Sequence, residues 1–202
     1  MKKLMMAAAA MVSSTAIYAQ QTIQSLEIGR TVPMEDVKMK SVDNKEVSLG
    51  SMRTQEGLLV MFSCNTCPYV IKSQERTKEL MTYARGKGIG MMIVNSNTAQ
   101  RDGADSYDAM ARYAKKQGYN VSYVVDEGAK VADAFGATRT PEVFLFDGTG
   151  KLVYKGAMED NPSEPASSKQ MFLRTAIDNM MAKKPIDPNS TKSIGCTIKR
   201  SM

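Results

Sequence analysis

Two cysteines separated by two residues are the part of this sequence best suited to chemistry. Cys64 and Cys67 follow the apolar run Leu58–Phe62 and precede Pro68, a residue that suits the first turn of a helix. A buried strand that leads into a helix brings thiols to unpaired backbone N–H groups, which lower a cysteine pKa to about 3.5–7.5. The pattern therefore predicts dithiol–disulfide chemistry.

A metal site is the first alternative for such a pair, and the composition argues against it. The chain has three cysteines and no histidine, whereas a structural zinc needs four ligands from these residue types. The lack of histidine also removes copper delivery and a Cys–His dyad. We therefore expect no metal and no other cofactor. A structural disulfide stays open, although so short a loop constrains little of the unfolded chain.

A second feature, Thr140-Pro141, stands just before the apolar strand predicted at Glu142–Phe146. In a redox fold of this kind such a proline is often cis and holds the preceding backbone beside the cysteines. An extended substrate segment can pair with backbone presented in this way. The alternative is an ordinary trans proline at the entrance of a strand.

The elements that must position these residues follow from periodicity and turn signals. Strands and helices alternate, and an antiparallel hairpin and a closing helix follow them. This order predicts an α/β chain with a central mixed sheet flanked by helices. The expected elements are a hairpin over 37–49, strands at 58–63, 89–94 and 121–125, helices at 68–85, 107–117 and 127–135, a hairpin over 142–155 and a helix over 171–182.

The N-terminus has the three regions of an export signal. Two lysines, the apolar residues 4–12 and a run of small residues lead to cleavage after Ala16 or Ala19. The apolar run is too short to span a membrane, which disfavours an anchor. We therefore divide the chain into a signal at 1–19, a redox domain at 20–184 and a tail at 185–202. The mature protein is expected in the periplasm or another extracytoplasmic space, without stable membrane insertion.

Composition sets further limits. A chain of 202 residues with 43% hydrophobic content can build one domain with a proper core. Its formal charge of +6 falls to +4 once Lys2 and Lys3 are removed, and the remaining charge forms no basic block. Nucleic acid is therefore not an expected partner.

Cys196 lies in the tail, and two interpretations of it stay open. Gly195 frees the neighbouring backbone, so the tail can fold back and exchange with the cysteine pair. Residues 185–190 have the composition of a linker, which instead favours an unpaired or intermolecular thiol on a disordered end.

Together these motifs resemble the thioredoxin fold, and more narrowly the redoxin or peroxiredoxin-like branch that includes alkyl hydroperoxide reductase and thiol-specific antioxidant proteins. The resemblance covers residues 32–199 and is carried by Cys64-Asn-Thr-Cys-Pro-Tyr-Val, Thr140-Pro141, Phe-Leu-Phe-Asp147 and the tail Ser-Ile-Gly-Cys196-Thr-Ile-Lys. It implies a thioredoxin-like domain with an N-terminal hairpin extension. It also implies that Cys64 is the attacking thiolate, that Cys67 resolves, and that Thr140 and Pro141 face the substrate.

The chain departs from its relatives in two ways. Peroxidases of the superfamily carry Pro-x-x-x-Thr/Ser-x-x-Cys before the peroxide-reducing cysteine. If that cysteine is Cys67, the proline and hydroxyl positions hold Val60 and Cys64. If it is Cys64, they hold Gly57 and Met61. Thioredoxin has a buried acid where this chain has Leu58. Glu142 is the candidate for a proton relay, and the alternative is that it is simply solvated.

Three functions are compatible with this sequence. The first is an exported thiol–disulfide oxidoreductase that acts on a protein or small-molecule disulfide and is reset by a thiol–disulfide electron-transfer partner. The second is a thiol peroxidase that reduces hydroperoxides through a sulfenic acid. The third is a binding protein whose cysteines form a stable bridge.

Overall fold

The computed structural model describes residues 23–201. The predicted export signal and its two cleavage positions lie outside the described residues. Within the described range no helix is long and apolar enough to cross a membrane.

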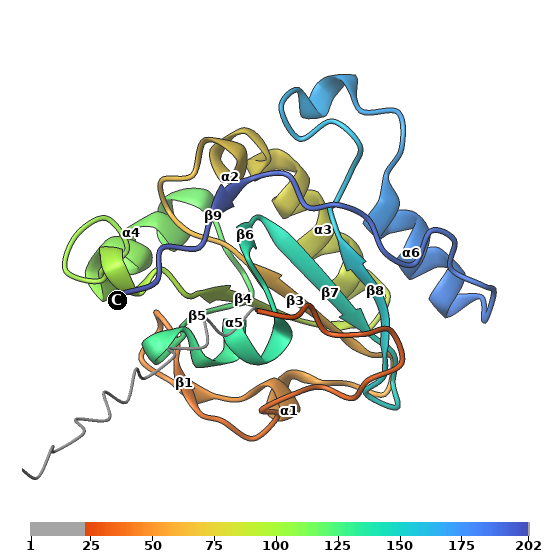
Figure 1. Ribbon diagram of the computed structural model, residues 1–202, viewed down its shortest axis with the longest axis horizontal. Helices are drawn as coiled ribbons and strands as arrows, with labels where there is room; N and C mark the ends of the chain where they lie inside the picture. The colour runs from red at the N-terminus through yellow and green to blue at the C-terminus, as the bar shows by residue number, and fades with distance from the viewer. Residues whose placement is uncertain (1–22, 202) are drawn as a thin grey trace, which may run out of the picture.

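A mixed sheet forms the centre of the molecule (Figure 1), with the strand order β5-β4-β3-β7-β8. Neighbouring strands are parallel between β3, β4 and β5 and antiparallel between β3, β7 and β8. Their bounds are β3 Leu58–Phe62, β4 Gly90–Asn95, β5 Ser122–Val125, β7 Glu142–Phe146 and β8 Leu152–Gly156. The predicted α/β fold with a mixed sheet is confirmed.

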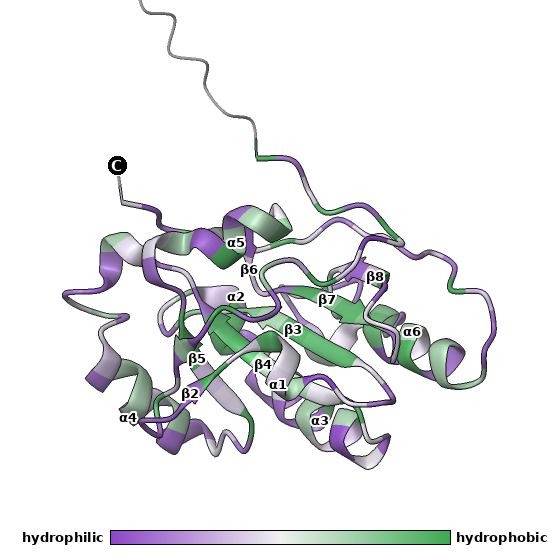
Figure 2. Ribbon diagram, turned by 90° about the horizontal axis from the view of Figure 1, so that it is seen from below, coloured by the Kyte–Doolittle hydropathy of each residue, from purple (hydrophilic) through white to green (hydrophobic). Residues whose placement is uncertain are grey.

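Helices cover both faces of this sheet, so its central strand is buried throughout. Successive β3 side chains alternate between two apolar layers: Leu59 and Met61 enter one, and Leu58, Val60 and Phe62 enter the other. Figure 2 shows the strands as the apolar centre between more polar helices. The first layer is completed by α3 Gln74–Gly86, α4 Tyr107–Gln117 and α6 Phe172–Met181, and the second by α1 Leu49–Met52 and α5 Lys130–Phe135.

The helix predicted over residues 68–85 is interrupted. It consists of α2 Pro68–Lys72 and α3. Ser73 stands between them, as the C-cap residue of α2 and the N-cap residue of α3. Ser73 has φ −90° and ψ 13°, outside helical geometry, while its N–H still bonds to the Tyr69 carbonyl. No proline or glycine stands between Pro68 and Arg85, which is why the sequence alone predicted one helix.

The predicted N-terminal hairpin is present as β1 Met39–Lys40 paired antiparallel with β2 Glu46–Val47. Short 3₁₀ turns occupy the loops at Thr98–Gln100, Glu127–Ala129 and Pro165–Ser167.

The tail is docked onto the domain, in contrast to the linker composition of its first residues. Its backbone first follows β8, where Thr191 N–H bonds to the Lys155 carbonyl. It then crosses the end of the sheet, and β9 Cys196–Thr197 pairs antiparallel with β6 Arg139–Thr140. Figure 1 shows this tail in dark blue, running from α6 past α2 and β6. The interpretation of a disordered end is therefore wrong, and we call residues 193–200 the strap.

Candidate active site

The two cysteines of the pair lie just beyond the carboxyl end of the central strand. Strand β3 ends at Phe62, whose partner across the antiparallel ladder is Glu142. Continuing this register by two residues brings Cys64 opposite Thr140. The Cys64 Sγ lies 3.4 Å from the Thr140 Oγ1, and the Cys67 Sγ lies 3.1 Å from the Thr140 carbonyl oxygen. Both thiols are almost fully buried.

The N-terminus of helix α2 belongs to Cys67. Pro68 is the first helical residue and Cys67 is the N-cap, with extended backbone geometry. Proline suits this position because the first N–H groups of a helix have no intrahelical partner. The Val70 N–H faces the Cys67 sulfur from the first turn. Cys64 stands three residues earlier, in the loop. Its assignment as the attacking thiolate stays a prediction.

Hydrogen bonds divide the two sulfurs into a proton donor and an acceptor. The thiols of Cys64 and Cys196 and the Val70 N–H donate toward Cys67, and the Cys64 bond is the largest cause that lowers the pKa of Cys67. Burial acts in the opposite direction and raises the Cys67 pKa, and the Thr140 carbonyl, 3.1 Å away, accepts a hydrogen bond only from the neutral Cys67 thiol. The donors outweigh burial, so the net shift of the Cys67 pKa is downward, to about 4.

Cys64 shifts the other way. Its hydrogen bond to Cys67 is the main cause that raises its pKa, and burial and the negative charge of Asp105 act in the same direction. The Thr140 hydroxyl lowers the Cys64 pKa without reversing the shift. One proton on Cys64 and one thiolate on Cys67 is therefore the favoured arrangement of the reduced pair.

The Thr140-Pro141 bond is cis, as in the first of the two interpretations of this motif. The Thr140 backbone lies beside both cysteines. However, the edge expected to receive an extended substrate is occupied by the chain itself, because Thr140 pairs with Cys196 of the strap. Cys196 is half-buried and packs against the cluster formed by Cys64, Cys67 and Val70.

A cavity of about 220 Å³ opens onto these sulfurs. Its walls come from the cysteine loop, the segment after β4 and the strap. The lining residues are Cys64, Thr66, Cys67, Asn97, Gln100, Cys196, Thr197 and Lys199. All three cysteines of the chain therefore share one small chamber, and all three are thiols in this structure.

A buried polar network that the sequence analysis did not identify fixes the cysteine loop. Asp105 is fully buried and accepts hydrogen bonds of 2.8 Å from the Asn65 N–H and from the side-chain amides of Asn95 and Asn97. Asn97 also accepts from the Lys199 N–H at 2.8 Å. The network thus connects the loop between the two cysteines to the strap. Its sequence signal is weak, because Asp105 lies forty residues from Asn65.

Glu142, the candidate proton relay, uses its carboxylate elsewhere. Its Oε2 accepts hydrogen bonds from the N–H groups of Thr138 at 2.9 Å and Arg139 at 3.0 Å. These bonds brace the turn that leads to the cis proline. Transfer of a proton by Glu142 stays a prediction, and its visible role is to position Thr140.

A family model described as Redoxin matches residues 27–171, which is more than half of the chain. The chain belongs to the Redoxin family. Among solved structures, this Redoxin protein is similar to an uncharacterized conserved protein from Geobacillus kaustophilus, at 30% identity and a TM-score of 0.80, covering 87% of this chain and 93% of that chain. It is also similar to a hypothetical protein from Sinorhizobium meliloti, at 29% identity and a TM-score of 0.78, covering 88% and 97%.

More distant structures share the fold. A putative thiol:disulfide interchange protein DsbE from Chlorobium tepidum is 19% identical with a TM-score of 0.60, covering 78% of this Redoxin protein and 99% of the other chain. The predicted thioredoxin-like fold is thereby confirmed. No curated protein matches the sequence.

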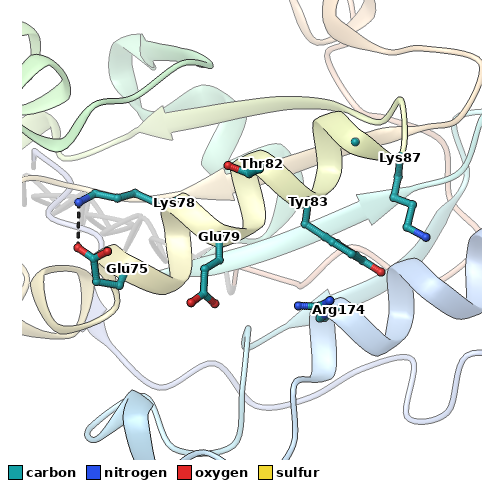
Figure 3. Close-up of a pocket in the computed structure, with 8 residues that line it drawn as sticks. Glu75, Lys78, Glu79, Thr82, Tyr83, Lys87 and Arg174 are labelled. Atoms are coloured by element: carbon teal, nitrogen blue, oxygen red, sulfur yellow. Dashed lines mark hydrogen bonds and ion pairs between the residues drawn. The ribbon is translucent and has the colours of Figure 1, made fainter.

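A larger depression of this Redoxin protein lies far from the thiols, between α3 and α6 (Figure 3), with a volume of about 620 Å³. Its charged side chains have partners: Lys78 pairs with Glu75, Glu79 with Arg76 and Lys87 with Asp178, and the Arg174 guanidinium lies 4.4 Å from the centre of the Tyr83 ring. No cysteine lines it. We therefore assign the chemistry to the smaller cysteine cavity.

Proposed function

We propose that this Redoxin protein is an exported thiol–disulfide oxidoreductase whose redox pair is Cys64 and Cys67. The observation that carries the proposal is the environment of the Cys67 sulfur, which lies at the N-terminus of α2 with donors directed at it. A thiolate is the nucleophile in disulfide exchange, and hydrogen-bond donors and a helix N-terminus stabilise it. The adjacent Cys64 thiol supplies the second sulfur of the disulfide that the pair forms when it gives up two electrons.

The exchange proceeds in two balanced steps. The thiolate attacks one sulfur of the client disulfide, forms a mixed disulfide and releases the other client sulfur as a thiolate. The second thiol of the pair then attacks the bound protein sulfur, and its proton passes to the departing client thiolate. The client gains two electrons and the pair becomes a disulfide. An external dithiol reverses these steps to reset the protein.

We assign the attack to Cys67 and the second step to Cys64, the reverse of the roles that the resemblance implied. Two features support this order: Cys67 is the N-cap of α2 with the Val70 N–H directed at its sulfur, and the negative charge of Asp105 disfavours a thiolate on Cys64. The mixed disulfide then forms on the sulfur nearest the Thr140 carbonyl.

Names of structural neighbours indicate the class of client. One is titled a putative thiol:disulfide interchange protein, and another, from Bacteroides thetaiotaomicron, a putative protein disulfide isomerase. By analogy we propose a disulfide-bonded protein or small disulfide as client, and a dithiol partner as electron donor.

Insulin reduction by dithiothreitol tests the proposal. Wild-type protein should accelerate precipitation of the insulin B chain, and Cys67→Ser should reduce the rate to that of dithiothreitol alone. Cys64→Ser/Cys196→Ser should react once and accumulate a mixed disulfide on Cys67, detected by intact mass. Full activity of Cys67→Ser would refute the assigned site. A pair that resists reduction below about −300 mV would favour the non-catalytic binding protein.

Reduction of hydroperoxides is the second candidate, because the lowered pKa of Cys67 and the small cavity also suit a peroxide-sensitive thiol. Against it, Val60 and Cys64 occupy the positions where peroxidases carry the proline and hydroxyl of their motif. Stopped-flow oxidation of Cys67 by hydrogen peroxide separates the two functions. Oxidation no faster than that of free cysteine would exclude the peroxidase.

We further propose that residues 1–19 direct export and are removed. The support is the basic, apolar and small-residue order of this segment. Expression of the full chain in a bacterium with a periplasm, followed by intact mass, should give a product that begins at Ile17 or Gln20. An uncleaved product in the cytoplasm would contradict export.

A further inference from the structure

The strap brings a third thiol to the redox pair. Its residue Cys196 lies opposite Thr140 in the β6–β9 ladder, and Thr140 contacts the sulfurs of both Cys64 and Cys67. The Cys196 thiol is directed at the Cys67 sulfur, and all three cysteines line the same cavity. Cys67 therefore lies beside two thiols, those of Cys64 and Cys196, with which it could form a disulfide.

Close packing and hydrogen bonds hold Cys196 in this position. Gly195 touches the Thr140 carbonyl so closely that a Cβ at this residue would lie 2.1 Å from the oxygen. Beyond Cys196, the Ile198 N–H bonds to the Thr138 carbonyl at 3.0 Å, and the Ile198 side chain is buried in the core. The segment that carries the thiol is thus built into the domain.

The strap also occupies the place where an extended client would pair. In this position it presents its own sulfur to Cys67, as a bound client would.

We propose that Cys196 is a second resolving thiol, which closes a Cys67–Cys196 disulfide within one chain in competition with Cys64–Cys67. This inference rests on the proposed oxidoreductase function and extends it. Cys67 attacks the client, and Cys196 can then attack Cys67 in the mixed disulfide while its proton passes to the departing client thiolate. Cys196 can equally attack a Cys64–Cys67 bridge, with Cys64 leaving as the thiol. The second reaction is an exchange without net oxidation.

The protonation of Cys196 follows the redox state of Cys67. In the reduced protein, burial raises the pKa of Cys196 to about 11, and the neighbouring Cys67 adds to this shift. Once Cys67 forms a disulfide it carries no negative charge, so this second cause disappears and Lys199 and Arg139 still favour the Cys196 thiolate. Formation of the mixed disulfide therefore makes Cys196 a better nucleophile.

A Cys64→Ser variant isolates the proposed reaction. The reduced variant is treated with hydroxyethyl disulfide, quenched in acid and analysed by intact mass and peptide mapping without reduction. We expect the reagent adduct on Cys67 to be transient and to give a peptide in which Cys67 is linked to Cys196. Wild-type protein under limiting reagent should contain both bridges, and this second measurement does not depend on the folding of the variant.

The matched control moves the thiol by two residues. Cys64→Ser/Cys196→Ser/Ile194→Cys places the sulfur on an exposed strap residue that does not line the cysteine cavity. Resolution by Cys196 should be roughly a hundredfold faster than by the displaced thiol, the factor that a small misplacement of a reacting group can cost.

Two results would overturn the inference: a stable adduct on Cys67 in Cys64→Ser, or equal rates for Cys196 and the displaced thiol. In either case formation of Cys64–Cys67 in the wild type would leave the oxidoreductase function intact. If Cys67 of the wild-type protein does not react with the disulfide reagent, both this inference and the proposed oxidoreductase function are wrong.

Discussion

Gly195→Ala is the substitution for which the structure gives the clearest expectation. A Cβ at this position would lie 2.1 Å from the Thr140 carbonyl oxygen and 2.8 Å from its carbonyl carbon, whereas ordinary contact begins at 3.4 Å. Both neighbours are backbone atoms, which cannot rotate away as the end of a side chain can. The strap must therefore move away by roughly 1.3 Å.

The energetic effect should be local. Overpacking of this kind costs about 1–3 kcal/mol. The strap beyond Gly195 is held by a few hydrogen bonds, including Ile198 N–H to Thr138 and Lys199 N–H to Asn97, each worth a net of about 0.5–1.5 kcal/mol. The free-energy cost of overpacking is therefore similar in size to the net free energy of the hydrogen bonds that hold the strap on the domain. It should therefore increase the open population of the strap by roughly 5- to 150-fold.

Hydrogen exchange measured on the peptide that contains Ile198 and Lys199 reports this opening directly. Exchange should accelerate in Gly195→Ala, while the urea midpoint of the whole domain changes little. Gly86→Ala is the matched control, because a Cβ there meets no atom within 4 Å. Unchanged exchange in Gly195→Ala, or loss of global stability equal to the local loss, would refute the reasoning.

Three further predictions concern charge around the sulfurs. Because the pKa of Cys67 is lowered, its alkylation by iodoacetamide should change by less than about twofold between pH 8 and pH 6, where an ordinary thiol slows by roughly 70-fold; a 70-fold decrease would show that the thiolate is not stabilised. Cys196→Ala removes one donor, so the midpoint of that pH profile should move upward, and an unchanged midpoint would mean that the two sulfurs do not interact. Asp105→Asn should lower the pKa of Cys64 and destabilise the fold by about 1.5–3 kcal/mol in urea, because three donors lose a charged acceptor; stability equal to wild type would contradict the role given to this network.

The sheet and its connections could be predicted because their signals are local. Leu58–Phe62 is apolar throughout, as expected of a strand covered on both faces, and the hairpin that starts at Glu142 has a glycine turn between its strands. Pro68 marked the start of the helix. The structure shows that Cys67, directly before it, is the N-cap, whereas the family resemblance implied Cys64 as the nucleophile.

Features that depend on distant contacts escaped the sequence analysis. The tail has the composition of a linker, yet it docks through backbone hydrogen bonds, which no side-chain pattern reveals, and through Ile198, a single apolar anchor. The network around Asp105 is equally hidden from local patterns. The Asp105 partner Asn65 lies on another loop, so their pairing appears only when the β3 and β4 ends meet.

The position of the strap in the chain has a consequence for biosynthesis. Residues 193–200 leave the ribosome after every strand of the central sheet, so the sheet can be completed while one wall of the cysteine chamber is still missing. During that interval Cys64 and Cys67 meet the surrounding redox buffer in an open groove. A chain truncated before residue 193 should therefore bind large thiol reagents that the finished protein excludes.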